Sequence, residues 1–313
     1  MKKAVTVLLS ATMLIGGAFG FTACNGDKEK NITVVVREAS SGTREAFDKV
    51  VTDGNGNYLN MKDSEGKTVL NTTSSAIQQT STGTVLSAVA NDKYAIGYIS
   101  LGSVNDSVSV VKVGGVTPSN ATVLDGTYSI QRPFVVMTKA GVELTDRAED
   151  FMNYLYSSAA KAHAEKAGCI FLEDETKRAN EGAAAIAVKD YSPLDNLPAG
   201  DKIIVRGSTS MEKFINEAAK GYAALYNESA ENVFSIELNG SSEGKSKVKE
   251  DTTGNVIGLS SAAVKDDAIN SFNVCLDAVA VIVNKANTDI TDLTLAQLYD
   301  IFSGKTTKFS EVK

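Results

Sequence analysis

The chain has 313 residues, of which 43% are hydrophobic and 22% are charged, and its formal net charge is −7 at pH 7. This length is sufficient for one large domain or for two medium ones with real cores. The negative charge and the lack of a nucleic-acid-reading motif argue against nucleic-acid binding. A single histidine, His163, leaves no basis for a histidine-based metal site or a Ser-His-Asp triad.

The N-terminal segment has the features of an export signal followed by a tether. Its first residues are positive, and residues 4–21 form an apolar run that is too short and wrongly flanked for a stable spanning helix. The run leads into Phe-Thr-Ala-Cys24, which resembles a bacterial lipobox, although Phe21 stands where leucine is usual. We expect a signal peptide over residues 1–23, lipidation of Cys24 and a polar tether over residues 24–30. An ordinary signal peptide cleaved near the same place is the alternative.

The first half of the chain predicts strands that alternate with helices. β-Branched and apolar runs predict strands at residues 32–36, 94–100, 108–113 and 134–138. Helical spacing of apolar residues predicts helices at residues 43–51 and 75–90, and two helices within residues 145–166.

The second half repeats this alternation after a polar interval. Residues 173–201 are polar and weakly patterned, which indicates a surface excursion or a linker. Strands are predicted at residues 203–205, 233–238, 256–259 and 278–284, and a short helix at residues 293–302. Strands that alternate with helices imply an α/β sheet architecture.

Four turns share one design, in which glycine and hydroxyl residues follow an apolar strand. They are residues 37–43, 206–210, 239–244 and 258–262. The first N–H groups of a helix have no internal partner, glycine lets a ligand approach closely, and serine and threonine add donors. Such a turn binds anions. We therefore expect the four turns, with Arg37, to converge on a compact tetrahedral oxyanion.

Each turn taken alone also has a purely structural interpretation. Serine and threonine are ordinary helix N-caps, and Arg37 alone would more often form a surface ion pair. A nucleotide P-loop is excluded because no Gly-Lys-Ser/Thr follows a glycine-rich loop. Ser41 has no visible base to make it a nucleophile, so no enzyme is expected. The repetition of the turns favours anion binding.

These motifs resemble those of the PstS-like substrate-binding lipoproteins of bacterial phosphate ABC transporters, over most of residues 31–157 and 201–313. Residues 37–43 resemble the family's Arg-x-x-x-Ser-Gly-Thr phosphate loop. Other segments that resemble the family are residues 95–100, 132–134, 204–211, 240–244, 257–261, 280–284 and 301–305.

The order of the motifs differs from the order in that family. There, the strand that resembles residues 204–211 comes first, and the Arg…Ser-Gly-Thr loop follows later. Joining residues 312–313 to residues 31–32 would restore the family order, so the sequence resembles a circular permutant. Such a permutation is physically possible, because proteins tolerate it where their termini are exposed and close together. A fragment of a fused tandem pair is the alternative.

The resemblance implies a two-lobed α/β fold of the periplasmic-binding-protein type (type II), in circularly permuted order, with the ligand in the cleft between the lobes. Residues 31–127 would form lobe II, with residues 287–313 packed on it. Residues 128–286 would form lobe I. The chain would cross between the lobes near residues 130–135 and 281–285.

The resemblance also implies which residues bind phosphate. They are Arg37, Ser41, Gly42, Thr43, Thr209, Ser210, Ser241, Ser242 and Ser261. Arg37 would pair with two phosphate oxygens, and the others would give hydroxyl and backbone donors. Some family members have an aspartate near the position of Ser261, which accepts the proton of hydrogen phosphate. The serine therefore leaves selectivity against sulfate open.

The function implied is that of a monomer without metal or cofactor that binds inorganic phosphate outside the cell. Cys24 would anchor it to the lipid bilayer of the cell membrane, where it would deliver phosphate to the permease subunits of an ABC transporter for import. A phosphate or oxyanion sensor or an adhesion protein is the alternative, and a secreted phosphatase-like enzyme is a third. An extracellular setting permits a disulfide between Cys169 and Cys275, but two separate buried thiols are expected.

Overall fold

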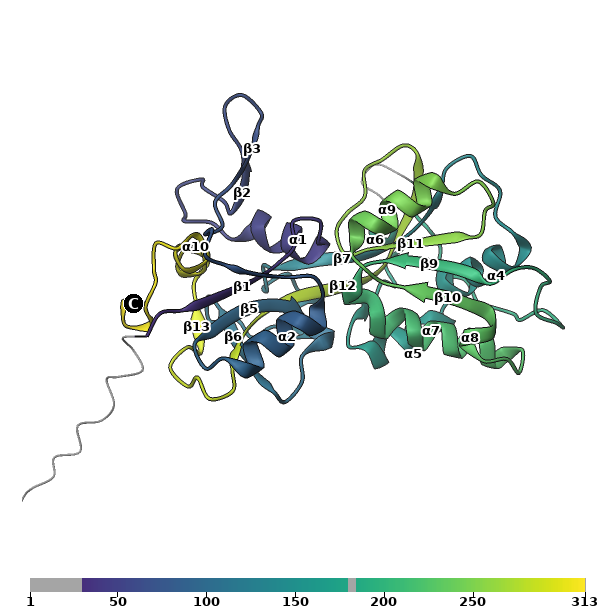
Figure 1. Cartoon of the computed structure of the whole chain (residues 1–313). Helices are drawn as coiled ribbons and strands as arrows, with labels where there is room; N and C mark the ends of the chain where they lie inside the picture. Colours follow the sequence, from purple (N-terminus) through teal and green to yellow (C-terminus); the bar gives the residue numbers. More distant parts are fainter. Residues whose placement is uncertain (1–29, 180–183, 313) are drawn as a thin grey trace, which may run out of the picture.

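The computed structural model describes residues 30–179 and 184–312. Two lobes lie side by side, and one 11-stranded sheet continues from one lobe into the other (Figure 1). The predicted signal peptide and Cys24 lie outside the described residues. No helix in the described part of the chain is long and apolar enough to cross a membrane.

The sheet has the order β10-β9-β11-β7-β12-β5-β1-β4, and β6, β8 and β13 join it beside this path. Strands β9, β10 and β11 are parallel in lobe I, and β1, β4 and β5 are parallel in lobe II. The central strands β7 and β12 run antiparallel to their neighbours. The strands of this sheet are β1 (Thr33–Arg37), β4 (Ile77–Gln79), β5 (Ala95–Ser100), β6 (Val108–Val113), β7 (Gln131–Lys139), β8 (Ile170–Phe171), β9 (Ile203–Gly207), β10 (Phe234–Glu237), β11 (Val256–Ser260), β12 (Ile269–Asn284) and β13 (Asp292–Leu293).

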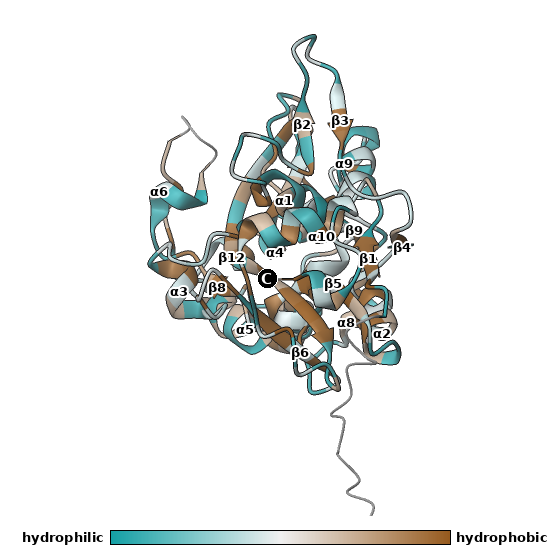
Figure 2. Ribbon diagram, turned by 90° about the vertical axis from the view of Figure 1, so that its left-hand side faces the viewer, coloured by the Kyte–Doolittle hydropathy of each residue, from teal (hydrophilic) through white to brown (hydrophobic). Residues whose placement is uncertain are grey.

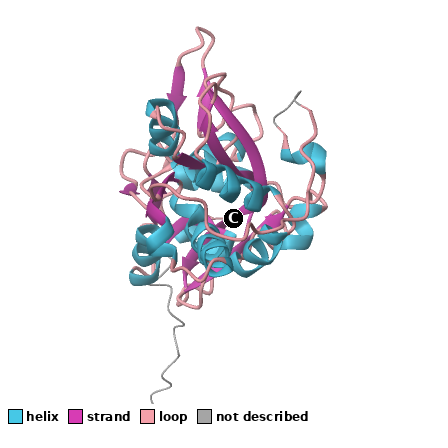
Figure 3. Cartoon of the chain, turned by 90° about the vertical axis from the view of Figure 1, so that its right-hand side faces the viewer, coloured by secondary structure: helices cyan, strands magenta, loops and turns pink. Residues whose placement is uncertain are grey.

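Helices cover the sheet in both lobes, as Figure 3 shows from the side of lobe I. The α-helices are α1 (Gly42–Val50), α2 (Thr82–Asn91), α3 (Asn120–Leu124), α4 (Asp146–Tyr156), α5 (Ala159–Ala167), α6 (Glu175–Arg178), α7 (Glu212–Leu225), α8 (Ala230–Val233), α9 (Ser241–Glu250) and α10 (Leu295–Ser303). The 3-10 helices are η1 (Leu101–Ser103), η2 (Thr209–Met211) and η3 (Phe309–Glu311). The predicted alternation of strands and helices is therefore confirmed.

Each lobe has its own hydrophobic core, and β12 contributes to both. Phe272 and Cys275 pack in the core of lobe I, whereas Val279 and Val283 pack in the core of lobe II. The chain therefore crosses within β12 before Val279, earlier than the predicted crossing at residues 281–285 and the predicted boundary after residue 286. The sequence could not show this, because β12 stays apolar on both sides of the crossing. Cys169 and Cys275 are both free and buried.

The predicted helix at residues 75–90 is wrong in its first part. Residues Ile77–Gln79 form β4, which pairs in parallel with β1, and α2 begins only at Thr82. Ser81 caps α2, and its hydroxyl accepts the N–H of Thr84 in a capping box. Ile77 fitted the helical spacing by chance, since in β4 its side chain is exposed at the edge of the sheet.

Two segments lie outside the 11-stranded sheet. Of the two predictions for the polar residues 173–201, the described parts, residues 173–179 and 184–201, support the surface excursion rather than the linker, because Ile186, Val188 and Leu197 pack against the core of lobe I. In lobe II, β2 (Asn60–Lys62) and β3 (Thr68–Leu70) form a hairpin that projects from the molecule. Figure 2 shows that the tip of this hairpin is hydrophilic, whereas the central strands of the lobe are mainly hydrophobic.

The two ends of the described fold lie next to each other. Asn31 pairs with Lys308 in an antiparallel bridge, and the Ile32 N–H donates a hydrogen bond of 2.8 Å to the Thr307 carbonyl oxygen. Figure 1 shows the C-terminus beside the start of β1. Adjacent ends are what a rearranged chain order requires.

Candidate functional site

The candidate site lies where parallel strands of the two lobes end and face each other. In lobe I the turns after β9, β10 and β11 meet there, and in lobe II the turns after β1 and β4 meet there. Ligands of open α/β sheets bind outside the carboxyl ends of the strands, where the donors of the following helices are exposed. The structure thus brings together the four predicted turns and adds a fifth, after β4.

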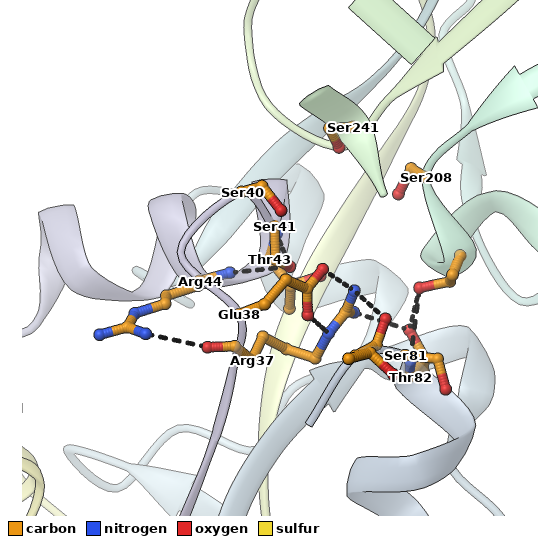
Figure 4. A network of polar contacts seen from close by, with 12 residues as sticks. Arg37, Glu38, Ser40, Ser41, Thr43, Arg44, Ser81, Thr82, Ser208 and Ser241 are labelled. Carbon is orange, nitrogen blue, oxygen red and sulfur yellow. Dashed lines mark hydrogen bonds and ion pairs between the residues drawn. The ribbon is translucent and has the colours of Figure 1, made fainter. Parts of the chain in front are cut away.

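The start of α1 supplies the first group of donors. Ser41 is the N-cap, and its hydroxyl accepts the N–H groups of Thr43 at 3.2 Å and Arg44 at 3.4 Å. The Thr43 hydroxyl reaches across to lobe I, where its oxygen lies 2.9 Å from Ser210 Oγ. Figure 4 shows Ser41 and Thr43 on one side of the site, with Ser208 and Ser241 on the other.

Gly42 allows the two lobes to come this close. A Cβ at this position would lie 2.7 Å from Ser241 Oγ, 2.7 Å from Ser261 Oγ and 2.8 Å from the carbonyl carbon of Ser261. A Cβ atom does not come this close to a non-bonded heavy atom, so any larger residue would push lobe I away from α1. Gly42 therefore permits a close approach of the two lobes, whereas its predicted role as a close N–H donor to phosphate stays a prediction.

Arg37 is buried in the site, with 2% of its surface exposed. Its Nε and Nη2 atoms donate to the two carboxylate oxygens of Glu38 at 2.8 and 2.7 Å, and its Nη1 donates to Thr82 Oγ1 at 3.3 Å (Figure 4). Sequence reasoning missed Glu38, although it directly follows Arg37 in the first turn. The guanidinium thus already has an acidic partner inside the site.

Thr82 is the second residue that sequence reasoning missed. Its backbone N–H donates to Thr209 Oγ1 at 3.3 Å, and its Oγ1 lies 3.3 Å from both Thr209 Oγ1 and Ser210 Oγ. The wrong helix prediction concealed this turn, because it placed the hydroxyl-rich residues 80–84 inside a helix. The signal was available, since these residues follow the design of the other turns.

The lobe I turns add a cluster of neutral hydroxyl groups. Ser208 donates to Ser261 Oγ at 2.8 Å, and Ser241 Oγ lies 3.3 Å from the same oxygen. The Ser261 N–H in turn donates to Ser241 Oγ at 3.1 Å. Ser208 lies within a predicted turn but had no predicted role. All three side chains are buried, and their hydroxyl groups bond to one another rather than to solvent.

Ser242 differs from the other predicted residues. Its side chain is exposed, and its hydroxyl donates to the Ser40 carbonyl oxygen of lobe II at 3.0 Å. It therefore joins the lobes at the edge of the site and does not contact the other hydroxyl groups.

A buried ion pair lies behind the lobe I turns. Arg132 Nη2 lies 2.9 Å from Asp277 Oδ2, and Arg132 Nη1 donates to the Ser261 carbonyl oxygen at 3.3 Å. Burial raises the pKa of the Asp277 carboxyl group, and Arg132 opposes this shift. Arg37 and Arg132 are thus balanced by Glu38 and Asp277, so directed hydrogen bonds rather than excess positive charge would hold an anion.

This arrangement suits the binding of an oxyanion. Within residues 30–179 and 184–312, no group of three or more histidine, cysteine, aspartate or glutamate residues could hold a metal ion. The hydroxyl groups of the two lobes bond to one another, and each can rotate to donate to an anion instead. Tetrahedral oxyanions accept several such bonds at once.

Comparison with known proteins gives consistent matches. Residues 23–159 and 195–312 match the PBP superfamily domain. The chain is 33% identical to "Phosphate-binding protein PstS 2" of Streptococcus pneumoniae serotype 4, over 100% of both chains. It is also 33% identical to "Phosphate-binding protein PstS" of Bacillus subtilis, but over only 42% of this chain and 38% of that protein. The crystal structure of a phosphate-binding protein of a phosphate ABC transporter from S. pneumoniae TIGR4 superposes with a TM-score of 0.62, at 33% identity, over 90% of this chain and 100% of that one.

The end-to-end alignment also bears on the order of the segments. Because the S. pneumoniae protein aligns over the whole of both chains, its segments follow the same order as those of this chain. Relative to that protein there is no rearrangement. A circular permutation relative to other members of the family stays a prediction.

Proposed function

The chain belongs to the PBP superfamily and, within it, to the PstS phosphate-binding proteins, and from this premise we propose that it binds inorganic phosphate between lobes I and II for import by an ABC transporter. It is a binding protein rather than an enzyme, and it acts outside the cytoplasm, as PstS-like proteins do. Its partners are the permease subunits of that transporter. Lipidation of Cys24, which would hold the protein at the membrane, is part of the same proposal.

One observation carries this proposal. Thr43 and Ser210, which are 167 positions apart and belong to different lobes, bring their hydroxyl oxygens within 2.9 Å of each other. Arg37 reaches the same place through Thr82, at 3.3 Å. A tetrahedral anion can accept bonds from all these donors together, and each charge-assisted bond contributes about 1.5–3 kcal/mol before the cost of desolvating the anion.

The first test is calorimetric titration of the wild-type protein with phosphate, together with two glycine variants. We expect wild type to bind phosphate with a dissociation constant at or below about 1 µM. Gly42→Ala places a methyl group against Ser241 and Ser261 across the lobes, so it should abolish measurable binding. Gly66→Ala, in the turn between β2 and β3, is the matched control: its new Cβ meets nothing within 4 Å, and the strain of its left-handed φ of 79° stays within the projecting hairpin, so it should bind as wild type does.

Three outcomes would count against the proposal. No heat with phosphate for the wild-type protein would reject phosphate binding. Binding that survives in Gly42→Ala would place the ligand away from the lobe junction. If phosphate binds but membranes containing the permease subunits do not retain the protein, the sensor or adhesion function becomes the better account.

A further inference from the structure

The 3-10 helix η1 of lobe II contacts lobe I away from the site hydroxyls. The Gly102 carbonyl oxygen accepts a hydrogen bond of 2.5 Å from Lys213 Nζ, near the start of α7. The Gly102 backbone also lies against the end of α5, at the peptide between Ala167 and Gly168. We propose that this η1 contact, made by Gly102, Lys213 and the Ala167–Gly168 peptide, holds the lobes closed and thereby sets the affinity for phosphate. The inference rests on the proposed function.

The contact between the two backbones requires glycine on both sides. A Cβ at Gly102 would overlap the Ala167 carbonyl oxygen and would lie 3.3 Å from the Gly168 carbonyl group. A Cβ at Gly168 would lie 3.0 Å from Gly102 Cα, and Gly168 also has a left-handed φ of 77° as the C-cap of α5. Backbone atoms cannot rotate away as a flexible side chain can. A side chain at position 102 therefore has to separate the lobes here.

The η1 segment is hydrogen-bonded to the strands in which the chain crosses between the lobes. Ser100, directly before η1, donates its hydroxyl to Asp277 Oδ1 at 2.9 Å, and the Gly102 N–H bonds to the same carboxylate. Asp277 lies on β12 and is paired with Arg132 on β7. Since these groups are buried, η1 cannot shift freely within lobe II, and a displacement at Gly102 changes the angle between the lobes.

The lobe I side of the contact continues directly into the phosphate site. Lys213 lies three residues after Ser210, in the segment where η2 runs into α7. Ser210 is the residue whose hydroxyl meets Thr43 of lobe II at 2.9 Å. Hydrogen bonds weaken steeply when their geometry is disturbed, so a movement of Lys213 should also weaken the hydrogen bond between Ser210 and Thr43. Residues that never touch phosphate can therefore control how tightly it is held.

The experiment compares Gly102→Ala and Lys213→Met with wild type by phosphate calorimetry, stopped-flow dissociation and thermal unfolding without phosphate. We expect Gly102→Ala to weaken phosphate binding about tenfold or more, and Lys213→Met about threefold. Both losses should appear as faster dissociation, with little change in the unfolding temperature of the ligand-free protein. Lys220→Met is the matched control, because Lys220 lies on the same helix and pairs with Glu217 of lobe I.

Small-angle scattering keeps the test independent of phosphate binding. Gly102→Ala should have a larger radius of gyration than wild type under the same conditions, because its lobes are held apart. Wild-type affinity in both variants, or an unchanged radius of gyration in Gly102→Ala, would overturn the inference. If wild type itself binds no phosphate, the proposed function fails, and the scattering result alone then decides whether the η1 contact closes the lobes.

Discussion

Lobe II and lobe I contribute different chemistry to one site. Lobe II brings charged groups, because Arg37 at the end of β1 and Glu38 directly after it form a partly buried ion pair. The lobe I turns bring neutral hydroxyl groups, such as those of Ser210 and Ser241, and the guanidinium behind them, that of Arg132, is already paired with Asp277. Because charge-assisted hydrogen bonds are about twice as strong as neutral ones, lobe II should hold the anion while lobe I covers it.

The largest loss of phosphate affinity is expected for Arg37→Met, which tests the charged role of lobe II. The substitution keeps much of the aliphatic stem but removes the guanidinium, so an anion would lose charge-assisted bonds and meet an unpaired Glu38. Two such bonds at about 1.5 kcal/mol each correspond to a loss of roughly 100-fold or more in phosphate affinity, measured by calorimetry.

The control for this variant is Arg206→Met in lobe I. Arg206 lies at the end of β9, where its side chain pairs with Glu237 and donates to the Ser235 carbonyl oxygen. It should bind phosphate as wild type does. Equal phosphate affinities for Arg37→Met and Arg206→Met would mean that the charge of lobe II does not hold the anion.

The site shows how far sequence reasoning reaches. The strands before Arg37 and before Ser208 were predictable from their apolar runs, and the turns after them from their glycine and hydroxyl residues. Predicted residues of the two lobes then meet because parallel strands place their carboxyl ends at one edge. No local pattern states that Thr43 meets Ser210. The resemblance implied only that both residues bind phosphate, and the structure brings their hydroxyl groups together.

The parts that were missed depend on long-range contacts. β4 has only three residues, and its pairing with β1 rather than its own sequence makes it a strand, so Thr82 was hidden in a predicted helix. The crossing within β12 was misplaced because β12 contributes apolar residues to both cores, so its sequence does not mark where the chain passes from one to the other. Glu38 was missed because a carboxylate next to an anion site is counterintuitive until its bonds to Arg37 are known.

Glu38→Gln tests whether the second charged residue of lobe II determines the selectivity between phosphate and sulfate. The carboxylate of Glu38 lies beside Arg37 and faces Gly240 of lobe I, where an added Cβ would be 3.3 Å from Glu38 Oε1. Hydrogen phosphate can donate its proton to a carboxylate, whereas sulfate has no proton at neutral pH and is repelled. We expect the ratio of sulfate to phosphate affinity to rise by about tenfold in Glu38→Gln, since one charge–charge contact is worth roughly 1 kcal/mol or more.

Competition calorimetry with both anions measures that ratio. Glu237→Gln is the control, because Glu237 pairs with Arg206 and should leave selectivity unchanged. If Glu38→Gln keeps the wild-type ratio, the carboxylate serves only to orient Arg37, and discrimination between the anions arises elsewhere.

The smallest effect is expected from the neutral lobe, in Ser210→Ala. The variant removes one hydroxyl that contacts Thr43 and Thr82 of lobe II and leaves every charge in place. A neutral hydrogen bond contributes about 0.5–1.5 kcal/mol, so phosphate affinity should fall only about 3- to 10-fold, mainly through faster dissociation. Ser246→Ala on α9, whose hydroxyl donates to Glu250, is the matched control and should change neither quantity. A loss as large as that of Arg37→Met would mean that the covering lobe contributes as much as the charged one, and the division of roles between the lobes would then be wrong.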